Sequence, residues 1–244
     1  MQDETFDRAA RAYVEAYFRT LDVLAEATGG APSRIVALMA AGIAPGPVYA
    51  RDPERGWWSA LDGWVDGGGG LPGERAETWF SPGTTWNLRQ ALLAHREGVS
   101  DAAIAQSLAE RFRTAFIAGL ETVEPARIAF PACFDTDGRI EPTTATDQAE
   151  TEWCSWLRGG YAVCLRTFTG ETCVRKESLG ALLKRHVADP TAWPMSAERA
   201  LEACEALAAL MLPFAPWERP TGTPGRTIDV LLAQHTLGRE QPYG

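Results

Sequence analysis

The sequence predicts a mainly α-helical globule with a small antiparallel β-hairpin or sheet, an α+β fold. Apolar residues recur every three or four positions along most of the chain, which is the period of an amphipathic helix. One stretch, residues 161–175, is instead rich in strand formers on both sides of a turn. The 244 residues, 45% of them hydrophobic, suffice for one good core or two modest ones.

The N-terminal segment is predicted to contain two helices. Apolar residues at helical spacing mark the first one: Phe6, Ala10, Tyr13, Tyr17, Leu21 and Leu24. Gly29 and Gly30 end it, and a shorter helix follows over residues 33–41 until Gly42 stops it. Residues 33–50, with a proline-rich turn after the helix, resemble half of a helix-turn-helix with a wing.

Residues 56–64 favour a short helix, because Trp57, Leu61 and Trp64 would share one face. The glycine run at 67–70 lacks the lysine and hydroxyl residue of a phosphate loop, so we interpret it as a flexible loop. These features predict three segments: an N-terminal helical subdomain (1–65), a Gly/Pro-rich loop (66–84) and a main helical domain (85–244).

The longest predicted helix begins after Ser100 and ends before Pro125. Its apolar stripe is formed by Ile104, Leu108, Phe112, Phe116 and Leu120. Residues 127–130 favour a short strand, and residues 135–138 favour a turn rather than a calcium loop. Three further helices are expected over about 179–187, 196–211 and 226–234.

The main domain also contains the predicted β-hairpin. Gly159 and Gly160 end the helix before it, and strands at 161–167 and 172–175 flank a turn of four residues. With that register Cys164 directly opposes Arg175, about 5 Å away at Cβ. The more polar face of the hairpin would then line a cleft, and we expect the functional pocket there.

Reactive and cationic side chains gather around this hairpin. The expected catalytic residues are Cys164, Lys176 and Glu177, and the expected substrate-binding residues are Trp153, Tyr161, Arg166 and Arg175. A thiol beside a cation can act as a nucleophile, and arginine can hold a carboxylate through two hydrogen bonds. The alternative is that Cys164 belongs to the core and that residues 175–177 form a solvated strand end.

Charge and hydropathy exclude several classes of function. The net charge of −9 and pI near 4.9 argue against a general nucleic-acid binder and against binding to anionic membranes. No apolar run approaches the roughly 20 residues that span a bilayer, and the N-terminus lacks a signal-peptide core. We therefore expect a cytoplasmic protein with no membrane or nucleic-acid partner; the sequence does not define the oligomeric state.

The cysteine pattern predicts no structural metal and no disulfide framework. No pair of the five cysteines has CxxC spacing, and the three histidines are far apart. Cys154, Cys164 and Cys173 could converge at the hairpin as a metal site, but their spacing matches no structural-zinc pattern. Small buried hydrophobic residues are the alternative interpretation. No cofactor is expected.

Three motifs carry a resemblance. They are Trp153…Gly160-Tyr161-Ala-Val-Cys164-Leu…Arg175-Lys176-Glu177, Leu212-Pro-Phe214-Ala-Pro216-Trp-Glu-Arg219 and Leu38-Met-Ala-Ala-Gly42-Ile-Ala-Pro45-Gly-Pro47-Val-Tyr49. Together they resemble an uncharacterised actinobacterial family of natural-product-biosynthesis proteins with a domain of unknown function. The resemblance implies a setting, a biosynthetic gene cluster, and no particular reaction. Ala162 stands where a second glycine is common in that family, and residues 221–226 replace a serine- and arginine-rich segment.

Three functional hypotheses follow. The first is a small tailoring enzyme of specialised-metabolite biosynthesis that acts on an amino-acid-like or carboxylate-bearing metabolite. The second is a non-catalytic partner, a scaffold or carrier-protein-binding module for another biosynthetic enzyme. The third is a transcriptional regulator that uses residues 33–50. A deep polar pocket at the hairpin would favour the first, an exposed apolar patch the second, and a basic face over residues 33–55 the third.

Overall fold

The computed structural model describes residues 4–239 of the chain, and the side chains of residues 4–234. Over these residues the chain forms ten α-helices and four strands, so the predicted mainly helical α+β class is confirmed. The helices are α1 (Glu4–Tyr17), α2 (Leu21–Thr28), α3 (Pro32–Ala40), α4 (Thr85–Arg96), α5 (Asp101–Thr122), α6 (Ala126–Ala129), α7 (Pro142–Leu157), α8 (Gly170–Ala188), α9 (Ala197–Leu210) and α10 (Val230–Arg239). None of these helices is both long enough and apolar enough to cross a bilayer.

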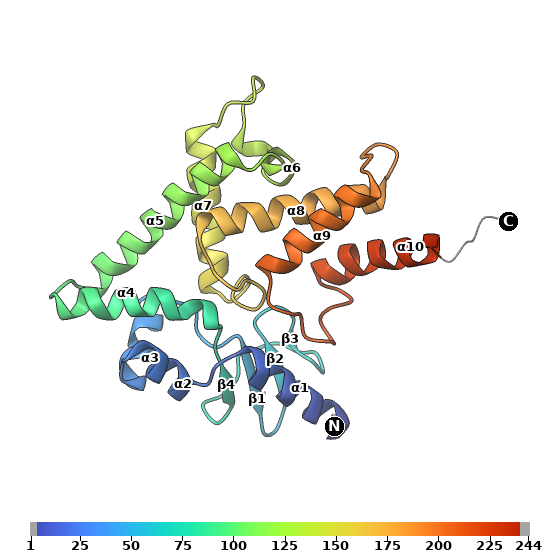
Figure 1. Cartoon of the computed structure of the whole chain (residues 1–244). Helices are drawn as coiled ribbons and strands as arrows, with labels where there is room; N and C mark the ends of the chain where they lie inside the picture. The colour runs from blue at the N-terminus through green and yellow to red at the C-terminus, as the bar shows by residue number, and fades with distance from the viewer. Residues whose placement is uncertain (1–3, 240–244) are drawn as a thin grey trace. The chain divides into compact units, whose positions relative to one another are not determined.

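The chain divides into two compact units that are discontinuous in sequence. Unit 1 comprises the described residues up to Thr114 together with Ala149–Phe168, and unit 2 comprises Ala115–Gln148 and the described residues from Thr169 onward. Each unit is coloured by sequence position in Figure 1. The boundaries fall inside α5 and α7, so each of these helices contributes residues to both units.

The predicted first helix is two helices. α1 ends at Tyr17, and α2 begins after Thr20, whose side chain accepts the N–H of Val23 as an N-cap. Arg19, between them, exchanges backbone hydrogen bonds with Phe80 at 2.9 and 2.7 Å. This antiparallel bridge requires extended backbone, which is why a continuous apolar period does not produce one continuous helix here.

The sheet lies in unit 1, at 49–79, rather than at the predicted hairpin. Its strands are β1 (Tyr49–Asp52), β2 (Gly56–Ser59), β3 (Gly63–Trp64) and β4 (Glu77–Trp79), all antiparallel in the order β3-β2-β1-β4. The prediction of a helix over 56–64 was therefore wrong. The turn before β2 explains the difference, because the Asp52 carboxylate accepts the backbone N–H groups of Glu54 and Arg55 and Gly56 takes a positive φ of 84°.

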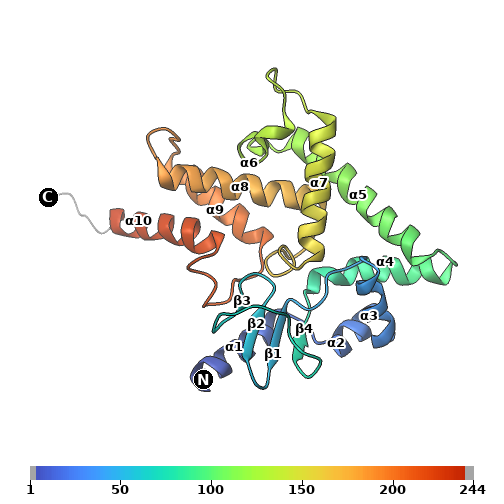
Figure 2. The same cartoon turned by 180° about the vertical axis from the view of Figure 1, so that it is seen from behind.

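Helix α1 covers one face of the sheet, here called the α1 face (Figures 1 and 2). Tyr13 packs edge-on against Tyr49, with ring centroids 5.7 Å apart. Asp7 accepts hydrogen bonds from Arg51 Nε at 2.6 Å and from Trp57 Nε1 at 2.9 Å. The bond from Arg51 lowers the pKa of the Asp7 carboxyl, and the bond from Trp57 adds to that effect against opposing desolvation. Every second residue of these strands points to this face, and the side chains there hold α1 against the sheet.

The opposite face, here called the pocket face, carries a cross-strand row of paired residues. Trp58 of β2 pairs with Ala50 of β1, which pairs in turn with Thr78 of β4. Directly paired residues point to the same side of a sheet, so these three share the pocket face. The alternation of strand residues therefore places Trp57 and its neighbour Trp58 in different environments.

An aromatic cluster (Phe112, Trp153, Trp156, Tyr161 and Phe168) forms a second core of unit 1. Phe168 lies between Trp156 and Phe112, with ring centroids 4.7 Å from each and interplanar angles of 7° and 11°. Tyr161 also packs on Phe168, at 5.5 Å. Stacked aromatic rings bury large apolar area with defined geometry, so this cluster holds the end of α7 and the segment after it in place.

The end of α7 approaches the sheet at a glycine. Gly159 has a φ of +96°, and a Cβ at this position would lie 2.5 Å from the Cβ of Ala60, just beyond β2. No larger residue fits this contact without displacing backbone. Gly159 thus serves both to end the helix and to bring residues 155–160 against the pocket face.

The predicted hairpin at 161–175 was wrong. Residues 158–164 form consecutive turns and residues 166–167 form bends, with the N–H groups of Val163 and Leu165 bonded to the carbonyls of Gly159 and Tyr161. The supposed turn and second strand are the first part of α8, which begins at Gly170. A capping box sets that start, because the Thr169 side chain accepts the N–H of Thr172 and the Thr172 side chain accepts the N–H of Thr169.

Unit 2 is a helical assembly built around α8. α9 runs alongside α8 in both views (Figures 1 and 2), and a buried apolar cluster joins these helices to the C-terminal segment. That cluster comprises Leu183, Ala203, Cys204, Leu207, Met211, Ile228 and Leu231. The predicted strand at 127–130 was wrong, since Ala126–Ala129 forms the short helix α6, and the predicted C-terminal helix begins with a π-helical turn at Gly225–Asp229.

Replacement of Gly159 by alanine is expected to destabilise the protein by more than an ordinary glycine substitution. A positive φ costs an L-residue about 1–2 kcal/mol, and the clash with Ala60 adds about 1–3 kcal/mol of overpacking. Gly98→Ala is the matched control, because Gly98 has a φ of +83° but no atom within 4 Å of its added Cβ. Urea unfolding of both variants would measure the difference, and equal losses for the two would contradict the close contact.

Candidate functional site

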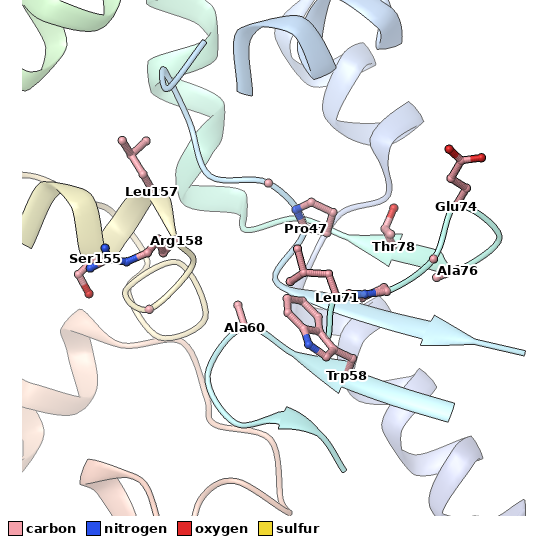
Figure 3. A pocket seen from close by; sticks show the side chains of 14 residues that line it. Pro47, Trp58, Ala60, Leu71, Glu74, Ala76, Thr78, Ser155, Leu157 and Arg158 are labelled. Carbon is pink, nitrogen blue, oxygen red and sulfur yellow. The ribbon is translucent and has the colours of Figure 1, made fainter. Parts of the chain in front are cut away.

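A pocket of about 950 Å³ lies on the pocket face of the sheet, within unit 1, and is here called the sheet pocket (Figure 3). It is lined by Gly46, Pro47, Trp58, Ala60, Leu71, Pro72, Gly73, Glu74, Ala76, Thr78, Ser155, Leu157, Arg158 and Gly160. Its size is in the range of sites for small organic molecules.

Three parts of unit 1 build the walls. The sheet contributes Trp58 and Thr78, and the loop between β3 and β4 contributes residues 71–76. The segment at the end of α7 contributes residues 155–160, which the Gly159–Ala60 contact holds against the sheet. The site therefore depends on a tertiary contact between segments about 100 residues apart in the chain.

Apolar groups dominate the lining. The apolar lining includes Pro47, Leu71 and the Trp58 indole, all labelled in Figure 3. Such a surface favours a ligand with an apolar body, because its burial removes carbon from water on both partners. The indole also offers an aromatic face for stacking.

The polar groups are few and lie on two sides. Ser155 and Arg158 come from the end of α7, whereas Glu74 and Thr78 come from the opposite side of the pocket (Figure 3). Arginine carries a permanent positive charge and binds carboxylates with two parallel hydrogen bonds. The chemistry that this arrangement supports is the binding of a mainly apolar molecule with an anionic group at the Arg158 side.

Two of the predicted substrate-binding residues are buried in the aromatic cluster. Trp153 and Tyr161 are buried members of the aromatic cluster. The Tyr161 hydroxyl donates a hydrogen bond to the Glu152 carboxylate. Arg166 is exposed, and the described pocket contains none of these three residues.

Cys164 is buried, with 3% of its surface exposed. Its Sγ lies 3.6 Å from the Tyr161 carbonyl oxygen and 3.8 Å from that of Gly160, which places the thiol as a donor to backbone carbonyls. This environment is that of a small core residue. The expectation that Cys164 opposes Arg175 across a hairpin was wrong, because Arg175 is on α8 and no paired strand exists there.

Arg175, Lys176 and Glu177 all belong to unit 2. Arg175 is exposed, and Lys176 Nζ forms an ion pair with Glu177 Oε1 at 2.6 Å. Desolvation lowers the pKa of Lys184, two turns further along α8, while Glu177 raises it and Lys176 lowers it. The structure thus brings Lys176 and Glu177 together but assigns them to a different unit from Cys164.

The cysteines are spread through the fold. Cys154 is exposed, and Cys133, Cys164, Cys173 and Cys204 are buried as free thiols. Burial raises the pKa of the Cys204 thiol, and the charge of Glu205 adds to that effect. Among the described residues, no group of three or more histidine, cysteine or acidic side chains is arranged to hold a metal ion.

Sequence reasoning missed the lining residues of the sheet because it misplaced the sheet. The signal was present: the hairpin turn Asp52-Pro-Glu-Arg-Gly56 separates two short runs that contain tyrosine and tryptophan. Once 56–59 is a strand, alternation puts Trp58 and Trp57 on opposite faces. Arg158 and Ser155 carry no comparable signal, because only their distance from the sheet makes them part of a site.

These features define a mainly helical protein with an apolar pocket on a small antiparallel sheet. The family of unknown function DUF6058 matches residues 108–236, more than half of the chain, and the chain belongs to this family. No curated protein matches the chain, and no solved structure matches it. The match includes residues 155–160 of the sheet pocket and excludes the sheet that forms its other side.

The native protein is expected to expose one fast-reacting thiol, that of Cys154. Buried thiols react with a disulfide reagent only after local opening, since the attacking thiolate must reach the solvent. Titration of the native protein with Ellman's reagent should therefore give about one fast equivalent, and Cys154→Ser should remove it. Denaturation of the wild type should raise the total to five thiols. Fast labelling that survives in Cys154→Ser but is lost in Cys164→Ser would identify Cys164 as the reactive thiol.

Proposed function

We propose that this protein binds a mainly apolar, carboxylate-bearing metabolite in the sheet pocket and serves as a small tailoring protein of specialised-metabolite biosynthesis. The observation that carries the binding role is the pocket itself. A volume of about 950 Å³ with a tryptophan, a leucine and prolines in its lining matches a small organic ligand better than it matches a flat protein surface.

The carboxylate preference rests on Arg158. It is the cation among the lining residues, and its exposed guanidinium is open to a carboxylate, which it can bind through two hydrogen bonds. Glu74, the lining carboxylate, comes from the other side of the pocket (Figure 3). A ligand with its anionic group at Arg158 and its apolar body over Trp58 satisfies both parts of the site.

The metabolic setting rests on the resemblance of three motifs to natural-product-biosynthesis proteins. One motif includes Gly160, and another includes Pro47, so two of the three contribute to the pocket lining. The predicted acid, base and nucleophile residues lie elsewhere, and catalysis would have to use groups of the pocket or of a bound partner. A non-catalytic binding role for another biosynthetic enzyme therefore stays the second candidate, favoured by the largely apolar lining.

The regulator hypothesis receives less support. Arg34 is paired with Asp101, Arg51 with Asp7, and Arg55 stacks on Trp64. Phosphate binding would have to compete with these carboxylates and with the stacking contact. The basic residues of segment 33–55 thus serve internal contacts of unit 1.

Two fluorescent probes test the pocket. 8-Anilinonaphthalene-1-sulfonate carries an apolar body and an anionic group, and N-phenyl-1-naphthylamine carries the apolar body alone. Arg158→Met should weaken sulfonate binding about 5–10-fold and leave the neutral probe nearly unchanged, because one charge-assisted contact is lost. Ala76→Trp, which fills the pocket, and Trp58→Ala, which removes its aromatic wall, should weaken both probes. If Ala76→Trp and Trp58→Ala bind both probes as tightly as the wild type does, and their circular dichroism is unchanged, the proposed site is refuted.

A gene deletion tests the metabolic setting. Untargeted comparison of metabolites should show an accumulated intermediate that is mainly apolar and carries a carboxylate, since loss of a tailoring step leaves its substrate unused. The purified protein should then bind that intermediate, and conversion of it on incubation would establish catalysis. If the parent strain expresses the protein and the deletion leaves the metabolite profile unchanged, this setting is contradicted.

A further inference from the structure

Leu71 is the most exposed large apolar residue of the described chain, with 80% of its surface in solvent, although it lines the sheet pocket. We propose that Leu71 is a ligand-contacting residue, held at the mouth of the pocket by an anchored loop and covered when an apolar ligand binds. The proposal rests on the proposed ligand binding in that pocket. It assigns the ligand an apolar group that reaches from Trp58 to the pocket mouth.

The loop that carries Leu71, here called the rim loop, comprises residues 67–73. Four consecutive glycines open it, and Gly67, Gly68 and Gly70 adopt positive φ angles between 86° and 94°. Such a segment has high conformational entropy in isolation and no side chains to pack. A fixed place for Leu71 therefore requires contacts that hold the loop from outside.

The first anchor holds the carbonyl groups before Leu71. The Arg55 guanidinium lies 3.9 Å from the ring centroid of Trp64 and donates from Nη1 to the Gly69 oxygen at 3.1 Å. Trp64 Nε1 donates to the Gly70 oxygen at 3.0 Å. Trp64 is buried in β3, so these bonds tie the rim loop to the sheet.

The second anchor holds the residue after Pro72. The Asp52 carboxylate accepts the backbone N–H groups of Glu54 and Arg55 and lies against Gly73, and the bond from Glu54, with the contributions of Arg55 and Gly73, lowers the pKa of Asp52. The same side chain therefore shapes the β1–β2 turn and fixes the far end of the rim loop. Only Leu71 and Pro72 lie between the two anchors.

The arrangement places an apolar side chain at an apolar cavity and leaves it in water. A leucine that is 80% exposed gains nothing for folding from its size, whereas contact with a ligand would remove its surface from water. Leu71 and Trp58 line the same pocket, Leu71 from the rim loop and Trp58 from β2 (Figure 3). A ligand between Arg158 and the mouth would thus be bounded by Trp58 on the sheet and by Leu71 on the rim loop.

The test is binding of N-phenyl-1-naphthylamine to full-length variants. Leu71→Ser should weaken binding about 10-fold, because one leucine side chain's worth of apolar contact is lost. Leu71→Met should stay within about threefold of the wild type, since its apolar volume is similar. Leu93→Ser is the matched control: Leu93 on α4 is 53% exposed and lines a separate cavity of about 310 Å³, and its loss should leave affinity unchanged.

Amide hydrogen exchange provides an independent readout. Probe binding should slow exchange of the rim loop in the wild type and in Leu71→Met, and much less in Leu71→Ser. Wild-type affinity in Leu71→Ser, together with lost binding in Ala76→Trp, would overturn the role of Leu71 and leave the pocket assignment standing. Wild-type probe binding that survives Ala76→Trp and Trp58→Ala would overturn the pocket assignment, and the inference with it.

Discussion

The site in unit 1 depends on the contact between Gly159 and Ala60. Helix α7 can end against the sheet only because position 159 has no side chain, and the positive φ there turns the chain back toward the pocket face. This contact sets the place of Ser155, Arg158 and Gly160 relative to Trp58. Without it the sheet would present an open apolar face, and the end of α7 would carry an unremarkable surface arginine.

The two faces of the sheet carry separate tasks. The α1 face is occupied by aromatic packing and by the Asp7 carboxylate, which binds Arg51 and Trp57 together. Those groups fix β1 and β2, and their alternate residues are thereby aimed at the pocket face. The aromatic cluster around Phe168 does the same for the other wall, because it secures the segment that follows α7. Both walls of the pocket are therefore backed by packed cores, a condition for a pre-formed binding site.

The segment that carries the predicted site residues, 153–177, does contribute to the sheet pocket, but through other residues. Trp153 and Tyr161 build the aromatic cluster, and Cys164 donates to backbone carbonyls beside it. The pocket takes Ser155 and Arg158 from the same stretch instead. Aromatic and thiol side chains look reactive in a sequence, yet they are also the groups that a small core needs most.

The sequence by itself determined the helical class and most helix ends, because apolar period, glycine stops and caps are local signals. Local signals failed where two structures suit the same residues: residues 161–167 are strand formers, but the capping box at Thr169 and Thr172 starts a helix directly after them. The turn at residues 52–56 indicates the β1–β2 hairpin locally, whereas the pairing of β1 with β4 and the formation of the pocket were decided by tertiary structure. Strand pairing and the approach of residue 159 to residue 60 join segments far apart in the chain, and the free energy of such contacts has no counterpart in the pattern of either segment.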